Sequence, residues 1–147
     1  MKRNLEIYFI ALFVVCSLIL FGCGKKESKK ITINYWDSMP SIEPVGMAIQ
    51  SLIKEFEEKN PSIKIKYQYV SWGELNTKLQ TSIVGGDPPD VVLLDRFVTC
   101  SYAYRGALVP LDPYIQKEKI NPKDFWACCW NEVVYDNKVW AIPFITD

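Results

Sequence analysis

The chain has 147 residues, enough for one domain, and it contains no histidine. Lysine and arginine together number 17, as do aspartate and glutamate, so the charge indicates no preference for nucleic acid or for acidic partners. The lack of imidazole excludes Ser-His-Asp and Cys-His catalysis and metal sites that need histidine, while a hydrophobic content of 49% indicates a core-forming chain.

Residues 1–22 have the pattern of a lipoprotein signal peptide. Lys2 and Arg3 form a positive n-region, and the apolar stretch Ile7–Phe21 is shorter than the ~20 residues that a membrane-spanning helix needs. The stretch ends in LFGC, which resembles the lipobox of bacterial lipoproteins. That resemblance implies cleavage before Cys23 and acylation, with palmitate among the acyl groups. An uncleaved signal anchor is the alternative.

Residues 23–30 are expected to form a flexible tether between the lipid and a domain that spans residues 31–147. The sequence GKKESKK is polar and rich in lysine. These lysines either lie on anionic headgroups or remain in a solvated spacer.

The domain begins with alternating strand and helix patterns. Apolar and polar residues alternate in 31–36 and in 63–70, which predicts two strands, the second with a wet face typical of a sheet edge. Between them a helix is expected from Pro44 to the stop at Asn60-Pro61. Its apolar face consists of Val45, Ala48, Ile49, Leu52, Ile53 and Phe56.

A second helix is expected from the capping box between Ser71 and Glu74 up to Gly85-Gly86, where glycine can adopt the left-handed conformation that ends a helix. Asp87-Pro88-Pro89 then forces a turn. Residues 90–94 (DVVLL) form a continuous apolar run, which predicts a central parallel strand buried on both faces.

The order strand, helix, strand, helix, strand predicts an α/β fold with a mostly parallel sheet flanked by helices. Four further elements are expected downstream. The first two are a short helix ending at 105–106 and an irregular apolar segment at 107–115. The third is a helix from Asn121-Pro122, with Phe125, Trp126, Cys129 and Trp130 toward the core. The fourth is a hairpin of 133–135 with 139–143 about Asp136-Asn137.

Candidate binding residues follow the predicted strands. In open α/β sheets, ligands bind just beyond the carboxyl ends of the strands. Asp95 and Arg96 come directly after 90–94, so they form either a polar binding tip or a solvated ion pair. Trp36 and Trp72 stand at the ends of two other strands, where each ring either stacks on a ligand or packs in the core.

Catalysis has little support in this sequence. Asp37, Asp95 and Asp147 stand at expected strand ends, where carboxylates either act as a catalytic pair or hydrogen-bond sugar hydroxyls without cleavage. No cofactor is expected, since Gly85-Gly86 ends a helix whereas a phosphate-binding loop opens one.

The cysteines do not have metal or redox spacing. Cys128 and Cys129 are adjacent, unlike the C-x-x-C of zinc and redox sites, and neighbouring helical side chains point about 100° apart. A bond between them would be strained, so buried and inert thiols are expected. A disulfide bond from Cys100 to Cys128 or Cys129 is an alternative if the domain lies outside the membrane.

The series ITINYWDS, EFEEKNPSIKIKY, GGDPPDVVLLD, GALVPLDPYI and YDNKVWAIPFITD, in this order, resembles the N-terminal lobe of extracellular solute-binding proteins of ABC sugar importers. The resemblance covers residues 31–147. It implies a type II periplasmic-binding-protein-like fold of two lobes, of which this chain holds an incomplete N-terminal lobe that stops near the hinge. A fragment with weak binding is therefore expected.

The resemblance also implies a binding site and partners. DRF after the buried strand is similar to maltose-binding protein, which implies sugar hydrogen bonds from Asp95 and Arg96. Trp36, Asp37, Ser38 and Asp147 correspond to further ligand-binding positions. The implied partners are a sugar or oligosaccharide and ABC permease subunits, and the implied location is the outer face of the cell membrane.

Two alternatives of other classes remain open from the sequence. One is a secreted carbohydrate-active enzyme, and the other is a surface lipoprotein with no role in transport.

Overall fold

The structure, a computed structural model, describes residues 30–144. Its centre is a three-stranded parallel sheet with the strand order β2-β1-β3. The strands are β1 (Ile31–Asp37), β2 (Ile63–Tyr69) and β3 (Val91–Val92). The predicted parallel α/β arrangement is confirmed, as is the edge position of β2. The prediction of a central third strand is wrong within the described residues, where β1 is central and β3 is a two-residue edge strand.

Two helices connect these strands, and both agree closely with the sequence pattern. They are α2 (Pro44–Lys59) and α3 (Trp72–Val84). Gly86 has a φ of 76°, and the amides of Gly86 and Asp87 donate to the carbonyls of Ile83 and Ser82. This is the Schellman pattern expected where glycine ends a helix. The capping box is wrong in detail, because the Ser71 hydroxyl bonds the Glu74 carboxylate and caps no backbone amide.

The second half of the chain contains short elements. They are α4 (Arg96–Tyr104), α5 (Asp112–Lys117), the 3₁₀ helix η1 (Pro122–Asp124), α6 (Ala127–Glu132) and the antiparallel pair β4 (Val134–Tyr135) and β5 (Lys138–Val139). A hairpin about Asp136-Asn137 is confirmed, with both residues at positive φ as a type I′ turn requires. The predicted second strand 139–143 is wrong in extent, because β5 ends at Val139.

Two other predictions about this half are wrong. The segment expected to be irregular contains α5, which begins at Asp112-Pro113, a favourable start because proline suits the first helical turn. The single helix expected from Asn121 is divided into η1 and α6 by the extended residues Phe125 and Trp126. This break leaves the Trp126 side chain 73% exposed instead of in the core.

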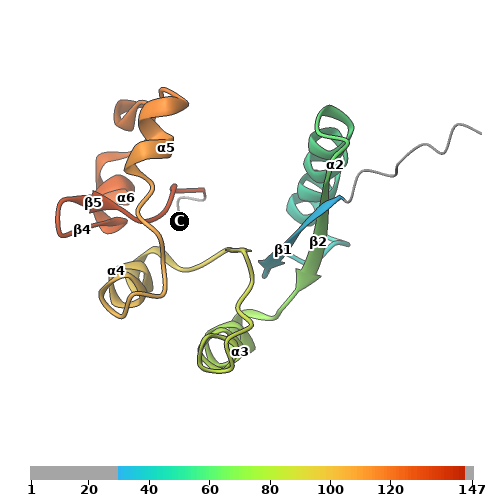
Figure 1. Ribbon diagram of the computed structural model, residues 1–147, viewed down its shortest axis with the longest axis horizontal. Coiled ribbons are helices and arrows are strands. Elements are labelled where there is room, and N and C mark those ends of the chain that lie inside the picture. The colour runs from blue at the N-terminus through green and yellow to red at the C-terminus, as the bar shows by residue number, and fades with distance from the viewer. Residues whose placement is uncertain (1–29, 145–147) are drawn as a thin grey trace, which may run out of the picture.

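The two halves lie apart and are joined through β3 and α3. Figure 1 shows β1, β2 and α2 on one side, α4, α5, α6 and the β4–β5 hairpin on the other, and α3 between them. The buried core lies at the junction. It consists of Trp36, Val70, Leu75, Leu79 and Tyr102, with Val92, Leu94 and Leu108 among the half-buried residues packed against it.

Much apolar surface stays uncovered in the described chain. On α2 only Ile49 of the predicted apolar face is fully buried, whereas Leu52 is 59% exposed and Phe56 is 42% exposed. The outer part of the sheet shows the same feature, since Val91 is half exposed. Within residues 30–144 the expected burial therefore holds for Ile49 and is wrong for Leu52, Phe56 and Val91. Nor is any helix of residues 30–144 long and apolar enough to span a membrane.

The close approach of α2 to the loop after β1 requires glycine. A Cβ atom added at Gly46 would lie 2.6 Å from the carbonyl carbon of Pro40. At Gly73, in the first turn of α3, a Cβ would meet nothing within 4 Å. Both glycines lie in helices, where glycine costs about 1 kcal/mol relative to alanine, so only packing distinguishes the two positions.

Gly46→Ala is expected to lower the unfolding midpoint in a urea titration followed by circular dichroism, because the loop must move away from α2. Gly73→Ala is the matched control and is expected to leave the midpoint unchanged or to raise it. Equal behaviour of the two variants would contradict the close packing of α2 on Pro40.

Candidate functional site

An open hollow of about 1110 Å³ lies where β3 ends. Its walls come from α3, from β3 and the residues after it, from α4, and from the last described segment Trp140–Phe144. Most of these walls are apolar, and the polar groups gather at the start of α4. The hollow therefore lies beyond the carboxyl end of a parallel strand, the usual position of ligand sites in α/β sheets.

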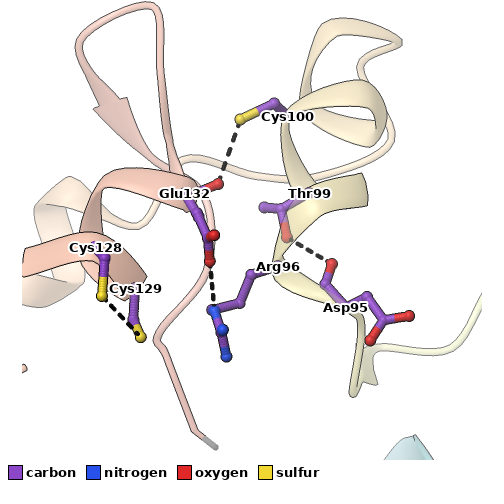
Figure 2. A network of polar contacts seen from close by, with 7 residues as sticks. All are labelled: Asp95, Arg96, Thr99, Cys100, Cys128, Cys129 and Glu132. Atoms are coloured by element: carbon purple, nitrogen blue, oxygen red, sulfur yellow. Dashed lines mark hydrogen bonds and ion pairs between the residues drawn. The ribbon is translucent and has the colours of Figure 1, made fainter. Parts of the chain in front are cut away.

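Asp95 and Arg96 both line this hollow, as their position after the third strand suggests. Asp95 is the N-cap residue of α4, but its side chain caps no amide, and its backbone carbonyl accepts the Thr99 hydroxyl at 3.4 Å. Figure 2 shows the Asp95 carboxylate pointing away from the Arg96 guanidinium. The carboxylate is exposed and is thus available to accept hydrogen bonds from a ligand.

Arg96 is fixed by a residue from the far part of the chain. Its Nε donates to the Glu132 carboxylate at 2.6 Å, and the Arg96 side chain is only 21% exposed. Glu132 ends α6 and also lines the hollow. Sequence reasoning missed this partner, because the two residues are 36 positions apart and no local pattern links them.

The two tryptophans predicted at strand ends have different surroundings. Trp36 is 9% exposed and belongs to the core, with the Lys78 ammonium 4.6 Å from its ring centroid. Trp72 begins α3, is 44% exposed and lines the hollow. This geometry favours core packing for Trp36 and leaves the Trp72 ring accessible to a ligand.

Asp37 lies behind the wall of the hollow instead of in it. It is fully buried, and its carboxylate accepts hydrogen bonds from the Tyr35 hydroxyl and, at 2.6 Å, from the Met39 amide. Tyr35 and Met39 line the hollow, so Asp37 positions two wall residues. Burial and the neighbouring Asp37 carboxylate raise the pKa of Tyr35, which keeps its hydroxyl protonated as a donor.

Ser38 is 2% exposed and does not line the hollow, and its hydroxyl has no hydrogen-bond partner. Asp147 and Cys23, the remaining predicted site residues, lie outside the described residues. The ligand-binding roles of all these residues stay predictions.

The cysteine predictions have a mixed outcome. Cys100, Cys128 and Cys129 are all free thiols, so Cys100 forms no disulfide bond with Cys128 or Cys129 in the structure. Cys129 is buried as expected, and desolvation by burial raises the pKa of its thiol. The expectation of burial is wrong for Cys128, which is exposed because the chain turns just before α6.

The site has the chemistry of a polar ligand-binding surface. It combines an exposed carboxylate, a guanidinium held in place by a salt bridge, and an accessible indole ring. The first two groups can accept and donate hydrogen bonds, and the indole offers an apolar face. Among residues 30–144, no three histidine, cysteine, aspartate or glutamate side chains are grouped to hold a metal ion.

A parallel α/β sheet with polar side chains beyond a strand end is the arrangement expected of a periplasmic-type binding protein, although other α/β proteins share it. Comparison with known families agrees. Residues 40–140 match the family described as bacterial extracellular solute-binding protein, and the chain belongs to this family. The predicted family is thus confirmed. Because it is a family of binding proteins and not of enzymes, the carbohydrate-active enzyme is no longer a competing interpretation.

Two relatives illustrate the match. An uncharacterized lipoprotein from Streptomyces antibioticus, encoded in the oleD 5′ region, is 25% identical over 135 residues, which are 90% of this chain and 29% of that protein. The multiple sugar-binding protein of Streptococcus mutans is 29% identical over 97 residues, 63% of this chain and 22% of that protein. The chain therefore spans less than a third of the length of these relatives.

Solved structures give the same fold. The substrate-binding protein Lmo0181 of Listeria monocytogenes, in complex with cycloalternan, superimposes with a TM-score of 0.66 and is 37% identical, covering 75% of this chain and 28% of that one. The described α/β unit thus corresponds to part of the periplasmic binding protein fold.

Asp37→Ala is expected to destabilise the chain by about 2–3 kcal/mol, because the partly buried Tyr35 hydroxyl and Met39 amide lose a charged acceptor. Asp95→Ala is the control, and its effect on the free energy of unfolding is expected to stay within about 0.5 kcal/mol, since Asp95 is exposed. Urea denaturation measures both values. A larger loss for Asp95→Ala than for Asp37→Ala would reverse the structural roles given to the two carboxylates.

Proposed function

We propose that this chain supplies one side of a sugar-binding site in the solute-binding component of an ABC importer. The observation that carries the proposal is the grouping of Asp95, Arg96 and Trp72 around one hollow in a member of this family. The names of the relatives support the ligand class, since one is a multiple sugar-binding protein and another was solved with cycloalternan. The ligand is therefore a sugar or oligosaccharide, delivered to permease subunits in the membrane.

The proposed division of labour follows from the contacts. The Asp95 carboxylate accepts hydrogen bonds from sugar hydroxyls, and Arg96, oriented by Glu132, donates to ring or hydroxyl oxygens. The Trp72 indole supplies an apolar surface for a sugar face. A second lobe closes over the ligand from the opposite side.

One lobe alone is expected to bind weakly. Small-molecule sites usually bury 70–90% of the ligand surface, and the hollow described above is open. We expect residues 23–147 by themselves to bind sugars with dissociation constants of about a millimolar or weaker, equivalent to ~4 kcal/mol or less.

Asp95→Ala, in a form of the protein that contains both lobes, is expected to weaken sugar binding by roughly ten- to a hundredfold, the loss of ~1.5–3 kcal/mol of charge-assisted hydrogen bonding. Calorimetric titration with a panel of mono- and oligosaccharides measures the change. Asp87→Ala, an exposed carboxylate that does not line the hollow, is the matched control and should bind like the unmodified protein.

Two results would contradict this assignment. Unchanged affinity after Asp95→Ala would remove Asp95 from the site while leaving the sugar ligand intact. Equal losses in both aspartate variants would indicate a general effect of charge instead of a direct contact.

We propose that the protein is anchored to the outer face of the cell membrane through lipid on Cys23. The lipobox-like LFGC supports the anchor, the family is extracellular, and the Streptomyces antibioticus relative is named a lipoprotein.

Cells that express the chain and are fed labelled palmitate are expected to incorporate label into the unmodified protein and not into Cys23→Ala. Cys16→Ala, which changes a cysteine inside the predicted signal peptide, is the control and should retain the label. Equal labelling of the unmodified protein and Cys23→Ala would exclude Cys23 as the lipid site.

A further inference from the structure

Two free thiols lie side by side at the start of α6. Cys128 and Cys129 lie in its first turn, and their Sγ atoms are 3.9 Å apart. Figure 2 shows both side chains projecting in the same direction from the helix. The proposed sugar site uses neither thiol, so this pair is a separate feature of the molecule.

The spacing of the sulfur atoms fits a shared ligand better than a direct bond. A disulfide needs the sulfurs at about 2.04 Å, which adjacent helical residues reach only with strain. If one central atom bonds both sulfurs at about 2.3 Å, the zinc–sulfur distance, then a separation of 3.9 Å corresponds to an angle of about 115° at that atom. A pyramidal three-coordinate centre needs a smaller angle, which the two side chains can reach by moving their sulfurs closer together, without forming a direct S–S bond.

The number of protein ligands limits what the pair can bind. The third thiol, Cys100, donates to the backbone carbonyls of Glu132 and Val134 at 3.4 and 3.8 Å and does not join the pair. As no three potential ligands cluster in the described part of the chain, a closed zinc site is not available there. A ligand for this pair must therefore be complete with two protein sulfur bonds, and its central atom must prefer soft donors.

We propose that Cys128 and Cys129 form a vicinal dithiol site that chelates one soft, thiophilic centre, of which a trivalent organoarsenical is the model ligand. Cys128 is exposed, so the ligand can reach its sulfur from solvent. Cys129 is only 3% exposed, so the bond that its sulfur forms to the ligand is shielded from water. The reaction involves no change in oxidation state. An arsine oxide, R–As=O, exchanges its oxygen for two As–S bonds, and the oxygen leaves as water with the two thiol protons.

The site is tested with phenylarsine oxide on the full chain in a background of Cys16→Ser and Cys23→Ser, which removes the thiols outside the described residues. Intact mass spectrometry in excess glutathione is expected to show one phenylarsenic group per chain, and thiol titration is expected to fall from three groups to one. Addition of a small dithiol should reverse both changes, since it competes as a chelator.

Single substitutions decide whether both sulfurs are needed. Cys128→Ser, at an exposed position, is expected to lose the adduct in glutathione, and Cys129→Ala should lose it too. Cys100→Ser is the matched control and should retain it, and circular dichroism verifies that each variant is folded. Retention in Cys128→Ser, loss in Cys100→Ser, or no adduct in the background protein would overturn the proposal.

Discussion

The short parallel ladder between β1 and β3 is the contact on which the rest of the described structure depends. Only Tyr35 and Trp36 pair with Val91 and Val92, and backbone bonds from Asp90 to Asn34 and from Leu93 to Trp36 extend the ladder at each end. The Asp90 carboxylate adds a bond from the Asn34 amide at 2.7 Å. This ladder and the Trp36 core hold the two halves together, because the β1–β2 pair makes no other sheet contact with the second half among residues 30–144.

The position of the candidate site follows from that ladder. Once β3 is fixed beside β1, the chain leaves the sheet at Leu93-Leu94 and enters α4 directly, so Asp95 and Arg96 must face the hollow at the strand end. α6 then approaches from the far side and supplies Glu132 to Arg96. The same approach brings the Cys128–Cys129 pair near the guanidinium without including it in the wall of the hollow. One helix thus orients Arg96 through Glu132 at its end and carries a thiol pair in its first turn.

Apolar side chains stay exposed on α2 and at the edge of the sheet within residues 30–144. Relatives are more than three times as long as the matched region, and an α/β sheet needs covering layers on both faces. Leu52 and Phe56 on α2 and Val91 at the sheet edge have apolar side chains because their patterns suit a buried environment. Local patterns indicate which side chains suit a buried position. They do not reveal which segment covers it.

The sequence by itself determined the order of the first five elements, the helix ends at Asn60 and Gly86 and the turn at Asp136-Asn137, because each rests on local periodicity or on residues that favour turns. It also indicated the family, through the series of motifs along the chain. It also selected Asp95, Arg96 and Trp72, since strand ends can be located from the pattern. Only the tertiary structure decided that Trp36 packs in the core, that Asp37 supports Tyr35, that β3 is an edge strand and that Glu132 holds Arg96. Those outcomes depend on contacts between segments distant in sequence, which side-chain spacing along the chain does not encode.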